Sequence, residues 1–109
     1  MRYLVIEPHP DDLASFCAGT VAKLLSEGHE VSTLVVTDGE QGTLDRKYDI
    51  DRKLAKVMRE EQMAACKLLG VDKVAFLGLK NLFLEPTHEL REMFVRHIRQ
   101  VQPAAVITI

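Results

Sequence analysis

The stretch Tyr3-Leu4-Val5-Ile6, which runs directly into Glu7 and Pro8, sets the start of the fold. It is short, apolar and rich in residues that favour β-structure, and a proline follows it closely, so it predicts a strand over residues 3–6. From residue 11 to residue 25 the apolar side chains recur every three or four positions, which predicts a helix that Gly28 ends. We expect Asp11-Asp12 to act at the start of this helix, where acidic and capping side chains are favoured.

The same two patterns alternate through the rest of the chain. Further strands are predicted over residues 31–36, 74–77 and 105–109, and further helices over residues 54–69 and 88–101, with Thr87 as the cap of the last helix. Alternating strands and helices indicate a parallel sheet with helices on both faces. The strands lack polar alternation, as expected of strands buried on both faces. We therefore predict an α/β fold, a Rossmann-like three-layer sandwich with a mostly parallel sheet, in a single domain over residues 1–109.

The strand predicted over residues 105–109 has no helix after it. We therefore expect the sheet to be truncated after its fourth strand and the chain to be the N-terminal part of a longer domain. The outer edge of this strand is apolar and uncharged, and such edges invite pairing with another chain. A homo-oligomer formed through this strand or its neighbouring face is the expected assembly.

The composition limits the classes of function. Of the 109 residues, 47% are hydrophobic and 28% are charged, and 14 Lys and Arg stand against 16 Asp and Glu, a net charge of −2. This balance excludes a disordered chain and argues against a nucleic-acid partner, because there is no basic field. No apolar run approaches the ~20 residues that span a bilayer, and the apolar start is too short for a signal peptide. Cys17 and Cys66 fall in predicted helices and are interpreted as reduced thiols of a cytoplasmic protein.

Parallel α/β sheets form their sites at the carboxyl ends of strands. Two predicted loops, residues 7–12 and residues 37–42, leave strands there and open on the same edge. In the first loop, the His9 imidazole and the Asp12 carboxylate stand three positions apart and suit Zn²⁺ or a similar divalent ion. Asp11 is placed to take a proton from a metal-activated water. The alternative is that the acidic pair only caps the helix and that His9 is an ordinary loop residue.

The string Pro8-His9-Pro10-Asp11-Asp12 at the end of the first strand resembles the hallmark of the LmbE/PIG-L family of metal-dependent N-acetyl-sugar deacetylases. Residues 37–42, 61–71 and 96–108 are similar to further stretches of that family, in the expected order. The resemblance implies a zinc-dependent hydrolase that removes acetyl groups from substrates of the N-acetylglucosamine type. It also implies that His9 and Asp12 are metal ligands and that Asp11 is the general base.

A third ligand and a set of substrate contacts are implied as well. The third ligand is a histidine of a His-x-x-His motif after the fourth strand, and the chain ends at Ile109 before any such motif. We therefore expect this chain to bind zinc weakly and to be inactive by itself. The residues that the resemblance places against the N-acetyl sugar are Asp38, Gly39, Glu40, Arg59 and Asn81.

Three positions depart from the family pattern. Leu13 stands where the family usually has an acidic residue. The substrate-contacting arginine is expected three residues before Glu61, a position that falls on Met58, with Arg59 one step later. Asn81 lies near the position of an aspartate that binds sugar hydroxyls.

Two other hypotheses stay open at this point. A response-regulator receiver domain has a similar length and an acidic pair after its first strand, but it needs an aspartate at the end of its third strand. Here that strand ends Phe76-Leu77-Gly78-Leu79, without an acid. The other hypothesis keeps the family fold without the chemistry, as a catalytically inactive binding member.

Overall fold

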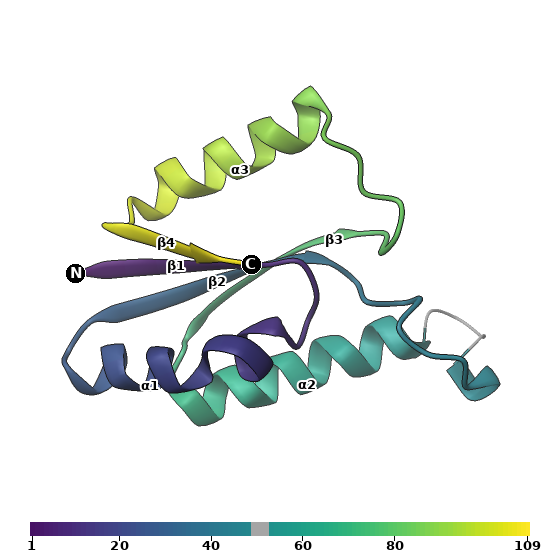
Figure 1. Ribbon diagram of the computed structural model, residues 1–109, viewed down its shortest axis with the longest axis horizontal. Helices are drawn as coiled ribbons and strands as arrows, with labels where there is room; N and C mark the ends of the chain where they lie inside the picture. The colour runs from purple at the N-terminus through teal and green to yellow at the C-terminus, as the bar shows by residue number, and fades with distance from the viewer. Residues whose placement is uncertain (49–52) are drawn as a thin grey trace.

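The computed structural model describes residues 1–48 and 53–109, and it contains all the expected strands and helices. Figure 1 shows their arrangement. The elements follow one another as β1 (Arg2–Glu7), a π-helical turn (Leu13–Cys17) that continues into α1 (Ala18–Ser26), β2 (Glu30–Thr37), a 3₁₀ turn (Arg46–Tyr48), α2 (Lys53–Leu69), β3 (Lys73–Leu79), α3 (His88–Val101) and β4 (Ala105–Thr108).

The four strands form one parallel sheet in the order β3-β2-β1-β4. Its register places Leu4 of β1 between Ser32 of β2 and Val106 of β4. A receiver domain would instead have β1 between β2 and β3. The strand order therefore excludes the receiver hypothesis. The winding direction reverses between β1 and β4, and in open α/β sheets ligands bind outside the carboxyl ends of the strands at such a point.

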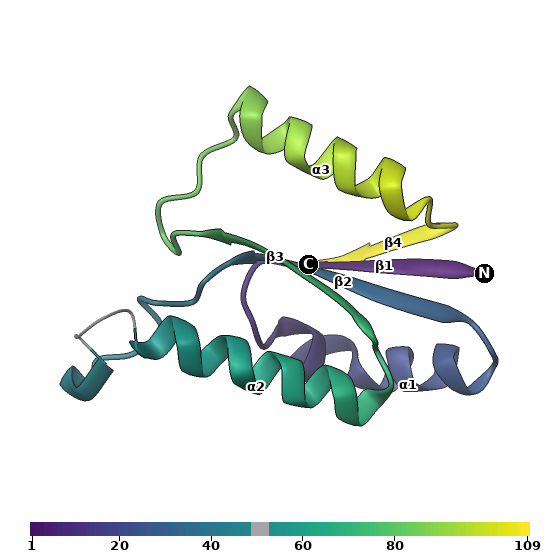
Figure 2. The ribbon, with the colours of Figure 1, turned by 180° about the vertical axis from the view of Figure 1, so that it is seen from behind.

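Helices cover both faces of the sheet, as predicted. α1 and α2 pack on one face and α3 lies over the other, which the two opposite views show (Figures 1 and 2). The core between the sheet and the first pair of helices is built from alternate strand positions and the inner faces of the helices. Its buried members are Val5, Leu13, Val21, Val31, Cys66 and Val71.

The start of the first helix differs from the prediction. Asp12 takes helical backbone angles but its side chain makes no capping hydrogen bond, and the helical turn begins at Leu13. The reason is that the Asp12 carboxylate turns back to the loop and accepts a hydrogen bond from the His9 backbone N–H. The cap of α3 is as predicted, because the Thr87 hydroxyl accepts from the Leu90 N–H at 3.2 Å.

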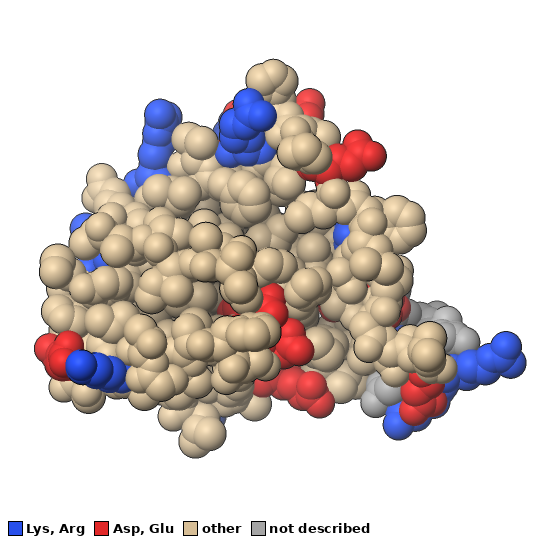
Figure 3. Space-filling view, viewed as in Figure 1, with Lys and Arg blue, Asp and Glu red and all other residues tan. Residues whose placement is uncertain are grey.

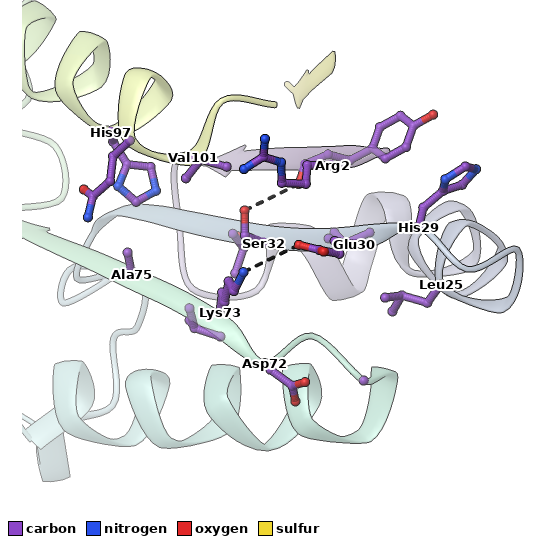
Figure 4. Close-up of a pocket in the computed structure, with 16 residues that line it drawn as sticks. Arg2, Leu25, His29, Glu30, Ser32, Asp72, Lys73, Ala75, His97 and Val101 are labelled. Atoms are coloured by element: carbon purple, nitrogen blue, oxygen red, sulfur yellow. Dashed lines mark hydrogen bonds and ion pairs between the residues drawn. The ribbon is translucent and has the colours of Figure 1, made fainter. Parts of the chain in front are cut away.

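A cavity lies at the amino ends of the strands, away from the loops that were predicted to carry the chemistry. It has a volume of about 730 Å³, and Figure 4 shows it between β2, β3 and the end of α3. Lys73 and Glu30 form an ion pair across its wall at 3.5 Å. On the face shown in Figure 3, Lys and Arg are scattered rather than gathered into one patch. Within residues 1–48 and 53–109, no helix has the length and apolarity needed to cross a bilayer.

Both cysteines are free thiols, and burial differs between them: Cys66 is buried in the core and Cys17 is half-buried. Burial raises the pKa of Cys66 to about 11, and it also raises the pKa of Cys17.

At pH 8 a thiol of pKa 11 is about one part in a thousand thiolate. We expect a thiol reagent at pH 8 to modify Cys66 only after the chain unfolds, with Cys66→Ala as the control that isolates Cys17. Modification of native Cys66 at the rate seen in denaturant would contradict this.

β4 is an edge strand on which Val106 is 42% exposed, and Ile109, directly after the strand, is 67% exposed. Self-association through this edge remains a prediction. We expect sedimentation velocity to show association that grows with concentration and weakens in Val106→Lys, because a charge on an edge strand opposes pairing. The matched control is Val95→Lys, at a similarly exposed position on α3. A monomer at every concentration would refute the expectation.

Candidate active site

The loop between β1 and the first helical turn folds on itself through hydrogen bonds centred on His9. The His9 carbonyl accepts from the N–H groups of Asp11 and Asp12, at 2.9 and 3.3 Å. In return, Oδ2 of Asp12 accepts from the His9 N–H at 2.7 Å and lies 3.2 Å from Nδ1 of the same residue. The imidazole and the carboxylate are therefore held side by side by the backbone of their own loop.

The separation of these two donors fits a divalent metal. Zinc bonds of about 2.0–2.1 Å at tetrahedral angles place neighbouring donor atoms about 3.4 Å apart. Nδ1 of His9 and Oδ2 of Asp12 are 3.2 Å apart, and their side chains are 46% and 10% exposed. In the part of the chain that the structure describes, no three His, Cys, Asp or Glu side chains gather as a metal site. The loop thus presents two donor atoms at a separation that one divalent ion could bridge.

Asp11 differs from its neighbour in exposure and in partners. Asp12 is buried and its carboxylate is hydrogen-bonded to His9, whereas Asp11 is exposed. Within residues 1–48 and 53–109, no hydrogen bond or ion pair engages the Asp11 carboxylate. One carboxylate of the pair is thus fixed toward the imidazole while the other can accept a proton.

The loop after β2 lies against this first loop, as predicted. Thr37 donates to the Pro8 carbonyl twice, from its N–H at 2.9 Å and from its hydroxyl at 2.7 Å. Gly39 follows with a φ of +68°, and a Cβ there would lie 3.2 Å from Cδ of Pro10. The positive φ therefore favours glycine at position 39, and a side chain there would crowd Pro10 of the first loop.

Asp38 joins the loop after β2 to the loop after β3. Its N–H donates to the Leu79 carbonyl at 2.9 Å. Its buried carboxylate accepts from the N–H groups of Glu40 and Asn81 on the same oxygen, Oδ1, at 3.0 and 3.3 Å. This arrangement brings three of the predicted substrate residues together, and it gives Asp38 a structural task that the sequence did not reveal.

Arg59 reaches the same edge from α2. Its guanidinium lies 4.2 Å above the centre of the Phe76 ring, a favourable cation–π contact. Both side chains line a cavity of about 240 Å³ together with Pro10, Thr37, Asp38, Ala55, Lys56 and Gly78. Arg59 thus shares a cavity with the loop that carries His9, although its place in the sequence is one position off the family pattern.

The sequence did not single out a buried polar cluster behind the loop. Glu7 is fully buried, and its carboxylate accepts from the Leu13 N–H at 2.9 Å, from Nε2 of Gln62 at 2.6 Å and from the Thr33 hydroxyl. Burial raises the pKa of Glu7, and the hydrogen bonds from Thr33 and Leu13 partly oppose that rise. A signal was present, because Glu7 follows Tyr3 and Val5 on the strand face that points to the helices.

Comparison with known proteins decides the family. The sequence profile of PIG-L, GlcNAc-PI de-N-acetylase, matches residues 4–109. The chain belongs to the PIG-L family.

Two deacetylases are similar to this chain, one compared by sequence and the other by structure. Diacetylchitobiose deacetylase of Thermococcus kodakarensis is 38% identical over 106 residues, which are 97% of this chain and 39% of that protein. The structure of N,N'-diacetylchitobiose deacetylase from Pyrococcus horikoshii, complexed with an inhibitor, superposes with a TM-score of 0.91 at 36% identity, over 96% of this chain and 39% of that one. The chain spans about two fifths to one half of the length of the curated relatives it matches.

A second solved structure shows that the fold is shared by an enzyme of a different name. The 4-carboxy-2-hydroxymuconate hydratase GalB from Pseudomonas putida has a TM-score of 0.84 at 24% identity, over 96% of this chain and 45% of that one. At this identity the likeness shows the fold alone. A shared fold does not determine the reaction, which depends on the residues of the site.

The role of Asp38 can be tested by its stability effect. Asp38→Ala leaves the buried N–H of Asn81 and the half-buried N–H of Glu40 without this acceptor, so we expect a loss of about 1–3 kcal/mol in the free energy of unfolding. Asp38→Asn keeps an amide oxygen for the same donors and should lose clearly less. Urea denaturation of the three proteins gives the comparison, and equal stability of all three would show that Oδ1 does not hold the two loops.

Proposed function

We propose that this protein hydrolyses the acetamide of an N-acetylglucosamine-type substrate, with Zn²⁺ or another divalent ion held by His9 and Asp12. The observation that carries the proposal is the pair of donors 3.2 Å apart beside the exposed Asp11. Membership of the PIG-L family and the deacetylase names of its relatives support the reaction class. The family resemblance also implies a histidine as a third metal ligand.

The described residues have distinct tasks in this proposal. His9 and Asp12 hold the metal, which supplies Lewis acidity and lowers the pKa of a bound water to about 7. Asp11 takes the proton of the attacking water on its carboxylate. The water oxygen bonds to the acetyl carbon, the C–N bond breaks, and the proton passes to the departing amine. Acetate and a free amino sugar are the products, and no oxidant or further reactant is needed.

The substrate approaches over the carboxyl edge of the sheet in this proposal. The cavity beside Pro10 offers the fixed guanidinium of Arg59 and the ammonium of Lys56, both able to donate to hydroxyl and carbonyl oxygens. Asn81 and the loop of Gly39 and Glu40 border the same edge through Asp38. A catalytically inactive binding member would share this surface, and only turnover separates the two hypotheses.

Substitutions of Asp11 and of His9 should have different effects on metal content in the complete protein. Asp11→Asn should keep metal content near the wild-type value and lower amide hydrolysis by roughly 10²-fold or more, because the general base is lost. His9→Ala should lose the metal together with the activity. Metal content by mass spectrometry and release of free amine from diacetylchitobiose are the two readouts.

Asp72→Asn is the matched control, since Asp72 is an exposed acid that lines the cavity at the opposite end of the strands. It should resemble the wild type in both readouts. Normal turnover in Asp11→Asn would refute the assignment of the base. A wild-type protein that binds metal but releases no amine from any N-acetyl sugar would favour the inactive binding member instead.

A further inference from the structure

We propose that Glu7 is a positioning residue, whose buried carboxylate closes the metal-ligand loop and anchors it to β2 and α2. This inference rests on the proposed function, because it takes His9 and Asp12 as the ligands. It extends that function to a residue outside the loop itself.

The first step is the closure of the loop. Glu7 is the last residue of β1, and Leu13 is the first residue of the helical turn that follows the loop. Oε2 of Glu7 accepts from the Leu13 N–H at 2.9 Å, so a single side chain bridges the two ends of residues 8–12. The spacing of the loop ends is thereby fixed, and with it the path of the backbone that holds His9 and Asp12 together.

The second step is the anchoring of this bridge. Oε1 of Glu7 accepts from the Thr33 hydroxyl on β2 and from Nε2 of Gln62 on α2. All three residues are buried. The carboxylate therefore ties the loop to one neighbouring strand and to one helix, and movement of the loop would break three hydrogen bonds in the interior.

The third step concerns the free-energy cost of this cluster, which does not favour stability. Gln62 donates to Glu7 and leaves its own Oε1 buried, without a hydrogen-bond partner in the described structure. Burying a carboxylate and an unsatisfied amide oxygen costs free energy, and apolar side chains of similar size commonly stabilise a core at least as well. This buried polar cluster costs free energy and contacts the end of the loop with the two donors. Such a combination is typical of a residue that serves a functional site.

Three variants of the complete protein separate positioning from folding. Glu7→Met keeps an unbranched side chain of similar length but cannot accept the three hydrogen bonds. Glu7→Gln keeps an oxygen for the Leu13 N–H, and its amide can donate to the unsatisfied Oε1 of Gln62 once that side chain turns over. Thermal unfolding of the metal-free proteins identifies the temperature at which each variant is folded.

Zinc affinity, measured at that temperature by competition with a chelator, is the deciding readout. We expect Glu7→Met to bind zinc roughly 10–100-fold more weakly than the wild type, the usual effect of losing a partner that orients ligands. The absorption spectrum of bound Co²⁺ should change in Glu7→Met, while Glu7→Gln should resemble the wild type in both readouts. A folded Glu7→Met with wild-type zinc affinity and Co²⁺ spectrum would overturn the proposal, even if it unfolds at a lower temperature.

The third variant covers the case in which Glu7→Met does not fold. Glu7→Asp keeps the charge but shortens the side chain by one methylene, so it should not span to Leu13 and should also lose zinc affinity. Wild-type affinity in folded Glu7→Asp would equally overturn the proposal. His9→Ala tells the two levels apart: if it binds zinc as well as the wild type, the proposed function fails, whereas a loss in His9→Ala without one in Glu7→Met refutes only the role of Glu7.

Discussion

The parallel pairing of β1 with β2 is the constraint on which the site depends. The register that sets Glu7 beside Val35 makes the two strands end at the same edge of the sheet, so the chain leaves both strands next to each other. Thr37 then donates twice to Pro8, which fixes the second loop against the first. These two hydrogen bonds join loops that are otherwise held by contacts of their own, the first within itself through His9 and the second to β3 through Asp38.

Much of this arrangement follows from the sequence. The alternation of apolar runs and helical spacings predicts the element order, because buried parallel strands and amphipathic helices leave different periodicities. The string from Pro8 to Asp12 predicts the paired donors, because a short loop with a helix after it brings residues three positions apart to the same side. The same string also predicts the PIG-L family, and the match over residues 4–109 confirms that prediction.

Other features depend on contacts that no local pattern records. Asp11-Asp12 is typical of a helix cap, but the Asp12 carboxylate accepts from the His9 N–H within the loop instead, and the helical turn begins at Leu13. Glu7 acts through Gln62, which lies 55 residues away in sequence, and Asp38 acts through Asn81, which lies 43 residues away. Burial of such polar groups is decided by the packing of distant elements, so it becomes visible only in the folded chain.

These contacts also divide the acidic residues by task. Glu7 and Asp38 are buried and accept from backbone N–H groups, which suits carboxylates that hold loops in place. Asp12 is buried beside an imidazole, as a ligand would be, and Asp11 is exposed beside it. In the proposed reaction the exposed Asp11 takes the proton, while Glu7 and Asp38 hold the loops in place.

X-ray absorption of the zinc-loaded protein tests the central claim, that His9 and Asp12 hold the metal, most directly. The account predicts a first shell of nitrogen and oxygen at about 2.0–2.1 Å, with outer-shell scattering from imidazole that decreases in His9→Ala. A sulfur scatterer at about 2.3 Å would place the metal on a cysteine and contradict the account. An imidazole signal that is unchanged in His9→Ala would contradict it equally.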